Sequence, residues 1–352
     1  MLDLGVEFGL FGGFIDGELG YYQKTINDMF FSRRVGPSAG YALLDVNDGS
    51  ILTSGLEFDV KFNIINKRDA SLSLVVNGES FSEEFKALPL DPSTGFEQKF
   101  QVDGLYGWEN GRSRYDYYIR EVAEVDPLTG KAQWFMNFVD NDFDGEFTDG
   151  DEKIQSLTQY LLDNPTATVA ETLTDVYNDG TRRFVGKSFI PDVRGAFRVN
   201  SSFKNFNLSV LFNYSLGGYI FDSGYQSLMS NSLPGNNAFH VDMRDRWQNV
   251  GDITDVPVYD ANLQVNQNGA STRFLVKGDY IALNNIRFGY NLPNDFINRI
   301  GFKRADLFVT GDNLFVTSAR IGLNPTTSQT GGSNFYKYNP LSTVTLGINL
   351  NL

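Results

Sequence analysis

The residues best placed to do chemistry lie in one acidic loop, residues 140–151. Oxygen-bearing side chains occupy its first, third and fifth positions, a glycine its sixth and a carboxylate its twelfth, the spacing of an EF-hand calcium loop. The candidate ligands are Asp140, Asp142, Asp144, Glu146 (through its backbone carbonyl) and Asp151. Because no base or nucleophile accompanies them, we expect calcium to stiffen the loop rather than to catalyse a reaction. The twelfth position carries Asp instead of the usual Glu, and a solvated acidic turn is the alternative.

A second set of candidate ligand contacts is aromatic. Rings gather in the segments that we predict to be long loops, where they could stack on the apolar faces of a sugar or peptide. The candidates are Trp108, Tyr117, Tyr118, Trp134 and Trp247. The alternative for each ring is packing within a loop or membership of an aromatic girdle at a membrane surface.

Catalytic sites find little support in the sequence. The chain has no cysteine and one histidine, His240, which excludes disulfides, Cys/His zinc sites and thiol chemistry. Residues 183–188 look like part of a phosphate-binding loop, but the upstream Gly180 is one residue too far away and no strand–loop–helix pattern surrounds it. No spacing singles out a carboxylate pair for glycoside hydrolysis. We therefore predict that the chain is not an enzyme.

Composition narrows the class of protein. In 352 residues, 14% are aromatic and 35 are glycine, which is too aromatic for disorder and too glycine-rich for a helical bundle. The net charge of −14 argues against a nucleic-acid partner. No stretch approaches the roughly 18 apolar residues of a transmembrane helix. Residues 1–8 lack the features of a signal peptide and alternate like a strand, so we expect the chain to begin inside a longer protein.

Strict alternation of apolar and polar residues predicts the elements that position these groups. It is clearest over Leu56–Ile64 and Val344–Leu352, where every second residue is apolar. The pattern predicts about nine strands, near residues 2–10, 14–25, 56–64, 70–76, 197–203, 206–212, 279–291, 304–316 and 344–352. The apolar phase slips within 280–290, which predicts a β-bulge near Asn284 and Asn285.

Short and long connections alternate along the chain, the longest spanning about residues 80–190. An outer-membrane β-barrel has this asymmetry, with short periplasmic turns and long extracellular loops. A soluble antiparallel sheet with one wet face would give the same alternation of side chains but has no reason to place every long loop at one end. The all-β, antiparallel barrel segment is therefore favoured, with Glu57, Asp59, Lys61 and Asn63 facing its interior.

Six short motifs follow one another along the chain, at residues 126–130, 186–192, 246–247, 273–293, 312–315 and 322–325. In this order they resemble motifs of SusC/RagA-type TonB-linked outer-membrane transporters. The most specific is the run 273–293, which is similar to the family's penultimate-hairpin motif. The resemblance covers nearly the whole chain and implies that residues 1–352 are the C-terminal part of a barrel of about 22 strands. Residues 80–190 would then be an extracellular loop insertion containing the acidic loop.

The resemblance also implies location and partners. The complete protein would lie in the outer membrane in contact with lipid and import oligosaccharides or peptides together with a SusD-like lipoprotein. It would engage TonB through an N-terminal part absent from this chain. The alternative function is a secreted all-β binding or adhesion module stabilised by calcium, which would be soluble without detergent. A carbohydrate-active enzyme is the least favoured reading of the residues.

Overall fold

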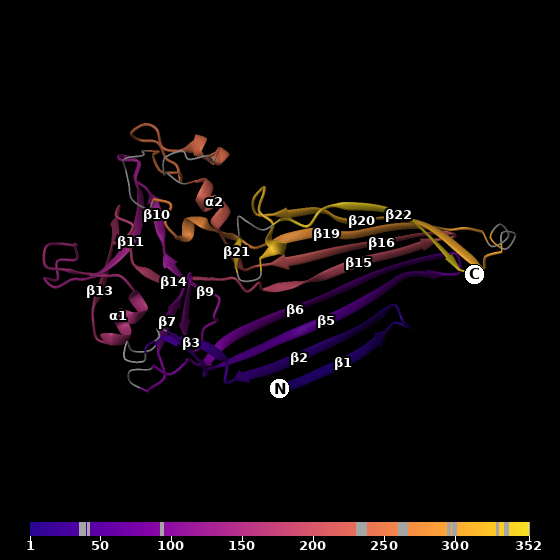
Figure 1. The fold of residues 1–352 in the computed structure, drawn as a ribbon, viewed down its shortest axis with the longest axis horizontal. Coiled ribbons are helices and arrows are strands. Elements are labelled where there is room, and N and C mark those ends of the chain that lie inside the picture. Colours follow the sequence, from indigo (N-terminus) through magenta and orange to yellow (C-terminus); the bar gives the residue numbers. More distant parts are fainter. Residues whose placement is uncertain are drawn as a thin grey trace.

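The computed structural model describes residues 1–34, 40, 43–91, 95–229, 238–259, 267–293, 297, 301–328, 331–333 and 338–351. In this part of the chain the main element is one antiparallel sheet of nine strands, each beside its neighbour in sequence among the nine (Figure 1). The strands are β1 (Leu2–Leu10), β2 (Ile15–Asn27), β5 (Ser50–Lys67), β6 (Ala70–Ala87), β15 (Val193–Phe203), β16 (Phe206–Leu216), β19 (Tyr280–Asn291), β20 (Arg304–Ser318) and β22 (Thr343–Asn351). The all-β class and the predicted strands are confirmed.

Tight turns gather at one end of this sheet. The β1–β2 turn carries Phe11, Gly12 and Gly13 at positive φ, and the β15–β16 turn carries Lys204 at φ 53°. Only two residues separate β5 from β6, and again β15 from β16. The long connections lie at the opposite end, away from the C-terminus (Figure 1). The predicted alternation of short and long connections is confirmed among the described residues.

The two faces of the sheet differ in chemistry. On one face the apolar side chains are exposed to an unusual degree, for example Leu56 at 61% and Leu346 at 79%. Val6, Leu19 and Phe58 are neighbours across β1, β2 and β5 on this face. The opposite phase of the same strands carries carboxylates, carboxamides and hydroxyls. A bare apolar face of this extent is unfavourable in water and stable in lipid.

The predicted bulge lies where the phase of the sequence slips. Phe212 pairs with Leu283 and Leu211 with Asn285, so Asn284 is an extra residue on β19. On β20 two residues oppose Asn284, because Leu283 pairs with Phe315 and Asn285 with Asp312. One of those two, Asn313, has φ 51°, a left-handed conformation that asparagine tolerates better than most residues. The bulge prediction is confirmed, and the irregularity extends across two strands.

The segment between β6 and β15 is not an irregular loop. One small sheet contains β7 (Phe100–Asp103), β8 (Tyr106–Glu109), β9 (Asp116–Arg120) and β14 (Arg182–Ser188). A second contains β10 (Val122–Val125), β11 (Ala132–Val139), β12 (Glu152–Ile154) and β13 (Val169–Thr174), with the helix α1 (Leu157–Asp163) nearby. We call residues 88–192 the outer region. Residues 183–188, whose spacing does not fit a phosphate-binding loop, lie in β14.

The other long connections are also structured. A hairpin of β3 (Phe30–Arg34) and β4 (Leu43–Asn47) separates β2 from β5, and β21 (Gly332–Ser333) precedes β22. Between β16 and β19 lie β17 (Tyr219–Asp222), α2 (Ser223–Leu228), two short 3-10 helices (Val241–Asp245 and Thr272–Phe274) and β18 (Leu275–Lys277). A further 3-10 turn, Pro325–Thr327, follows β20. No helix in the described residues is long and apolar enough to cross a membrane.

The main cluster of buried side chains lies among these connections. Its members come from β9 and from the segment between β16 and β19: Tyr117, Ile119, Phe221, Met229, Met243, Val256, Phe274 and Leu275. A smaller cluster, Ile51, Phe85 and Leu88, joins the ends of β5 and β6 to the outer region. Both clusters bury apolar surface from segments distant in sequence, so the connections form a packed layer over one end of the sheet.

A matched pair of glycines tests how closely the strands approach. A Cβ added to Gly195 would lie 2.0 Å from the Asn77 carbonyl oxygen, whereas one added to Gly5 would meet nothing nearer than 3.9 Å. We expect Gly195→Ala to lower the free energy of unfolding by about 1–3 kcal/mol, because the backbone must shift. We expect Gly5→Ala to leave it nearly unchanged. Denaturant unfolding of the chain in detergent micelles measures both, and equal midpoints would contradict the close approach.

Candidate functional site

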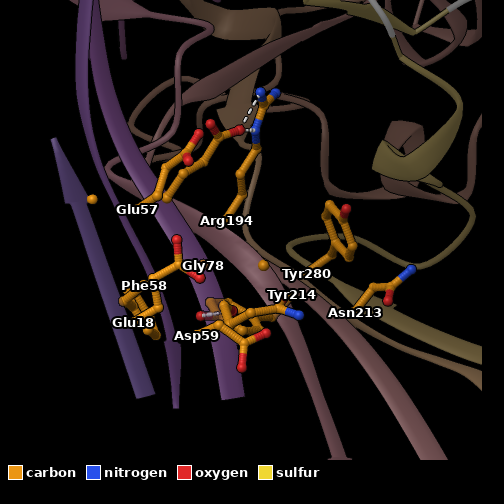
Figure 2. A pocket seen from close by; sticks show the side chains of 13 residues that line it. Glu18, Glu57, Phe58, Asp59, Gly78, Arg194, Asn213, Tyr214 and Tyr280 are labelled. Carbon is orange, nitrogen blue, oxygen red and sulfur yellow. Dashed lines mark hydrogen bonds and ion pairs between the residues drawn. The ribbon is translucent and has the colours of Figure 1, made fainter. Parts of the chain in front are cut away.

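A cavity of 580 Å³ opens on the polar face of the sheet. Its charged lining residues are Glu18, Glu57, Asp59, Glu79 and Arg194, which come from β2, β5, β6 and β15 (Figure 2). The strand register brings them together, because Glu18 pairs with Asp59, Glu57 with Glu79, and Glu79 with Arg194. The alternation of the strands therefore assembles this cavity from residues far apart in sequence.

The charges in the cavity are unbalanced. Arg194 donates from Nε to the Glu79 carboxylate at 2.5 Å, so these two charges largely neutralise each other (Figure 2). Among the described residues, Glu18, Glu57 and Asp59 take part in no ion pair. A concave surface with excess negative charge attracts cations and repels anions. Sequence reasoning placed Glu57 and Asp59 on this face but missed Glu18, Glu79 and Arg194, although their strand phase indicated the same side.

The acidic loop gathers three of its five predicted ligands. Carboxylate oxygens of Asp140, Asp142 and Asp144 lie within 4.8 Å of one another. One oxygen of Asp140, Oδ1, is buried without a hydrogen-bond partner within the described residues, while its Oδ2 accepts a hydrogen bond of 2.8 Å from the Gly145 amide. A buried oxygen without a donor is typical of a cation ligand. The chemistry of these groups fits a hard cation such as calcium.

Asp151, the fifth predicted ligand, makes hydrogen bonds within the acidic loop. Its Oδ2 accepts a hydrogen bond of 2.8 Å from the Thr148 amide and its Oδ1 one of 2.9 Å from the Asn141 amide. These two bonds lower the pKa of the Asp151 carboxyl below its usual value. The side chain closes the loop through the backbone, and neither it nor the Glu146 carboxylate belongs to the cluster of three carboxylates that the described residues form.

Three of the five aromatic candidates are fully buried. Tyr117, Tyr118 and Trp134 are each 0% exposed. The Tyr118 hydroxyl lies 2.8 Å from the Ser156 hydroxyl, and the Trp134 ring packs edge-on against Tyr177. These side chains form the interior of the outer region, so the stacking role that we predicted for them does not hold in this structure.

Trp108 and Trp247 are partly exposed but also hold loops together. Trp108 packs against the rings of Phe31 and Phe85, with centroids 5.6 and 5.5 Å away. The Trp247 indole donates a hydrogen bond of 3.0 Å to the Pro127 carbonyl. A role for these two rings in ligand binding stays a prediction. His240 is structural, because its Nδ1 accepts a hydrogen bond of 3.2 Å from the Asp242 amide.

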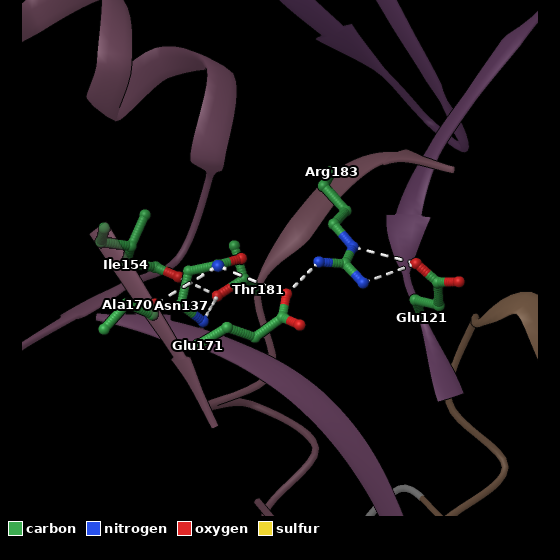
Figure 3. A network of polar contacts seen from close by, with 7 residues as sticks. All are labelled: Glu121, Asn137, Ile154, Ala170, Glu171, Thr181 and Arg183. Atoms are coloured by element: carbon green, nitrogen blue, oxygen red, sulfur yellow. Dashed lines mark hydrogen bonds and ion pairs between the residues drawn. The ribbon is translucent and has the colours of Figure 1, made fainter. Parts of the chain in front are cut away.

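Polar contacts fix the two sheets of the outer region to each other. The Arg183 guanidinium bridges the carboxylates of Glu121 and Glu171 (Figure 3). Beside it, the Thr181 hydroxyl accepts a hydrogen bond from the Asn137 amide at 2.7 Å and donates one to the Ile154 carbonyl at 2.6 Å. A network of polar contacts such as this one stiffens the segments that it connects. The outer region is therefore suited to present a defined surface.

One hydroxyl connects three of the long connections. The single hydroxyl hydrogen of Tyr117 is shared between the carbonyls of Gly331 and Tyr219, whose oxygens lie 2.8 and 3.0 Å from the hydroxyl oxygen. Burial raises the pKa of Tyr117 far above its usual range and that of Tyr106 beside it to about 12. Tyr117 thus stays protonated at every physiological pH and remains a hydrogen-bond donor.

Known TonB-dependent receptors are similar to this chain over nearly its whole length. The chain is 24% identical over 368 residues to TonB-dependent receptor P3 of Formosa agariphila, an alignment that covers 99% of the chain and 33% of the relative. It is 24% identical over 366 residues to TonB-dependent receptor P39 of the same organism, covering 98% of the chain and 35% of the relative. The chain thus spans about a third of the length of the curated relatives it matches. No protein-family model matches it.

Solved structures show the same fold. The chain superposes on a structure of the RagAB peptide transporter with a TM-score of 0.76 at 21% identity, covering 99% of the chain and 34% of that structure's chain. It superposes on the RagAB peptide importer in its closed-closed state with a TM-score of 0.77 at 20% identity, covering 99% and 35%. The resemblance to SusC/RagA-type TonB-linked transporters predicted from the motifs is confirmed.

The Tyr117 hydroxyl can be tested by removing it. We expect Tyr117→Phe to destabilise the packed connections by about 1–3 kcal/mol, because the two carbonyls lose the hydroxyl hydrogen that they share. The control is Tyr338→Phe, since the Tyr338 side chain is 97% exposed. Hydrogen exchange of the amides in β9, β17 and β21 measures the effect. Unchanged exchange in the Tyr117 variant would show that the hydroxyl does not hold the connections together.

Proposed function

We propose that this chain forms part of the wall of a TonB-dependent outer-membrane transporter of the SusC/RagA type, which imports oligosaccharides or peptides. The observation that carries the proposal is the nine-stranded sheet, with a bare apolar face, a polar opposite face and all described long connections at one end. Contact with lipid suits the apolar face, and contact with water and solute suits the polar face. The similarity to TonB-dependent receptors supports the same conclusion.

The two edges of the sheet support further strands. β1 and β22 lie at the ends of the strand order, and neither has a second partner among the described residues. In lipid an unpaired backbone donor or acceptor is costly, so spanning sheets close into barrels. We infer that strands from the rest of a longer protein pair with both edges and complete a barrel of about 22 strands.

The polar face and the packed connections would then have separate roles in transport. The polar face lines the path of the solute, and the connections form the extracellular mouth, where a SusD-like lipoprotein would dock. Coupling to TonB would reside in other parts of the longer protein. The solved neighbours are a peptide transporter and a peptide importer, which supports transport rather than catalysis as the function here.

We also propose that the acidic loop binds calcium through Asp140, Asp142 and Asp144. Their convergence and the buried Oδ1 of Asp140 support a cation, which would offset the repulsion among three adjacent carboxylates. The ion would stiffen the loop between β11 and β12 on the extracellular side. A secreted calcium-stabilised module, the alternative raised by the sequence, leaves the bare apolar face unexplained.

Single cysteines test the orientation of the sheet, because the chain has no cysteine of its own. Leu56 and Glu57 are adjacent on β5 and point to opposite faces. In membranes of cells that produce the protein, we expect a fluorophore on Leu56→Cys to be quenched by lipids carrying a quencher in their acyl chains. We expect the fluorophore on Glu57→Cys to be quenched by a water-soluble quencher instead. Equal lipid quenching at both positions would refute the membrane-spanning sheet.

Calcium binding is tested by charge removal at constant size. We expect calorimetric titration of the purified chain to show binding at millimolar calcium or below, and Asp142→Asn to weaken it at least about tenfold. Asp149→Asn is the matched control, because Asp149 lies in the same loop but outside the three-carboxylate cluster. The calcium site would be ruled out by absent binding in the unsubstituted chain, or by equal losses in the two variants.

A further inference from the structure

The cavity of 580 Å³ described above has an excess of carboxylates, and we call it the acidic cavity. A second cavity on the polar face has a different lining. Its volume is 340 Å³, and none of its lining residues is charged. Its floor is formed by β16, β19 and β20, and its other side by residues near Asn324 and by the approach to β22. Five of the lining residues are asparagines: Asn213, Asn284, Asn313, Asn324 and Asn339. Asn213 also lines the acidic cavity, so the two cavities adjoin.

The double bulge builds the floor of this cavity. Asn284 is the extra residue of β19, and Asn313 is one of the two residues that oppose it on β20. A regular ladder would point every second side chain to the lipid side, whereas a bulge re-aims the extra residue. Bulges often lie beside binding sites for this reason. The positive φ of Asn313 is a further local cost that the fold accepts at this position.

Most of the hydrogen-bonding capacity of these asparagines is unused within the protein. Among the described residues, the side chains of Asn213, Asn284 and Asn339 have no hydrogen-bond partner. Asn324 uses its Oδ1 to accept from the Thr326 amide and hydroxyl, at 3.1 and 2.7 Å, which leaves its amide donors available. Each carboxamide offers two donors and one acceptor. Beside six apolar residues in its lining, the cavity therefore presents several carboxamide donors and acceptors and no charge.

The wall opposite the sheet is held in place. The Ser318 hydroxyl donates to the Leu323 carbonyl at 2.7 Å, directly before Asn324. Arg320 pairs with Asp222 and lies over the Tyr225 ring, 3.7 Å from its centroid, which ties this connection to α2. On the other flank, the Ser342 hydroxyl donates to the Asn313 carbonyl at 2.6 Å. The carboxamides thus project from a preformed site, which lowers the entropy cost of binding.

We propose that this cavity binds an uncharged saccharide unit. A charged group would lose its water there without finding a counter-charge, which is costly. A peptide backbone offers groups on one side only about every 7 Å, whereas a sugar ring carries hydroxyls on adjacent carbons that both donate and accept. Densely placed carboxamides match the sugar better. The inference rests on the proposed function, since solute reaches this cavity only if the polar face lines a transport path.

Binding is measured by calorimetry on the purified chain in detergent. The probes are the neutral trisaccharides maltotriose, cellotriose and xylotriose, the anionic trimer of galacturonic acid, and a tripeptide of alanine capped at both ends. We expect at least one neutral trisaccharide to bind at millimolar concentration and more tightly than the anionic trimer. The capped peptide represents the rival class of ligand. If the peptide binds and no neutral sugar does, the proposal is overturned.

Three variants locate the site. We expect Asn284→Ala and Asn339→Ala each to weaken sugar binding at least about tenfold. Asn339 lies on an exposed connection, so its variant remains informative if the bulge does not tolerate Asn284→Ala. Asn207→Ala, on the same face of β16 but outside the cavity, should bind like the unsubstituted chain. Absence of sugar binding, or binding that neither cavity variant weakens, overturns the proposal.

The two proposals fail in different ways. Sugar binding in detergent does not depend on whether the apolar face meets lipid, and lipid quenching at Leu56→Cys does not depend on any sugar. A quenched Leu56→Cys label with no sugar binding would refute the saccharide site alone. Sugar binding with equal lipid quenching at both labelled positions would refute the membrane-spanning wall alone.

Discussion

Continuous antiparallel backbone pairing is the constraint on which the rest of this structure depends. β5 and β6 pair from Ser50 and Ala87 at one end to Lys67 and Ala70 at the other, with register shifts at Ser50/Ile51 and Asn63/Ile65. Because each strand satisfies the backbone of its neighbours, the interior strands can meet lipid without unpaired polar groups. The same pairing forces side chains to alternate, so one sheet has two chemically opposite faces. The acidic cavity follows from the polar phase of that alternation, whereas the cavity lined by asparagines depends on the bulge that interrupts it.

At the end of the sheet that carries the long connections, packing of apolar side chains replaces strand pairing as the main stabilising interaction. There the chain leaves the ladder and buries its apolar side chains in a core of its own, built around Tyr117, Phe221 and Phe274. Rings meet mostly edge-on or tilted, as in Phe221 against Phe274. This packing explains why connections far longer than usual loops are ordered where the structure describes them. One chain thus combines a lattice of backbone hydrogen bonds with a small hydrophobic core at its end.

The sequence predicted the strands of the main sheet much better than the packing of the long connections. Alternation of period two is a local signal, so the strands, their faces and the bulge at Asn284 could be found from the residues alone. Burial of Tyr118 and Trp134 could not, because it depends on contacts with segments distant in sequence. The acidic loop lies between these cases. The spacing of its oxygen-bearing residues is visible in the sequence. The hydrogen bonds from the Asn141 and Thr148 amides to the Asp151 carboxylate are not, because they depend on how the loop folds.

The hydrogen bond from Tyr117 to Gly331 joins residues 214 positions apart. A contact over that separation gains little until the intervening chain is already ordered, since closing so long a loop costs entropy first. Within that interval β15 pairs with β16 across a two-residue turn, and β19 pairs with β20, the next strand of the sheet in sequence. We therefore infer an order of assembly in which hairpins zip first and the packed connections consolidate last. The packed connections would then become ordered only after the strands beneath them have paired.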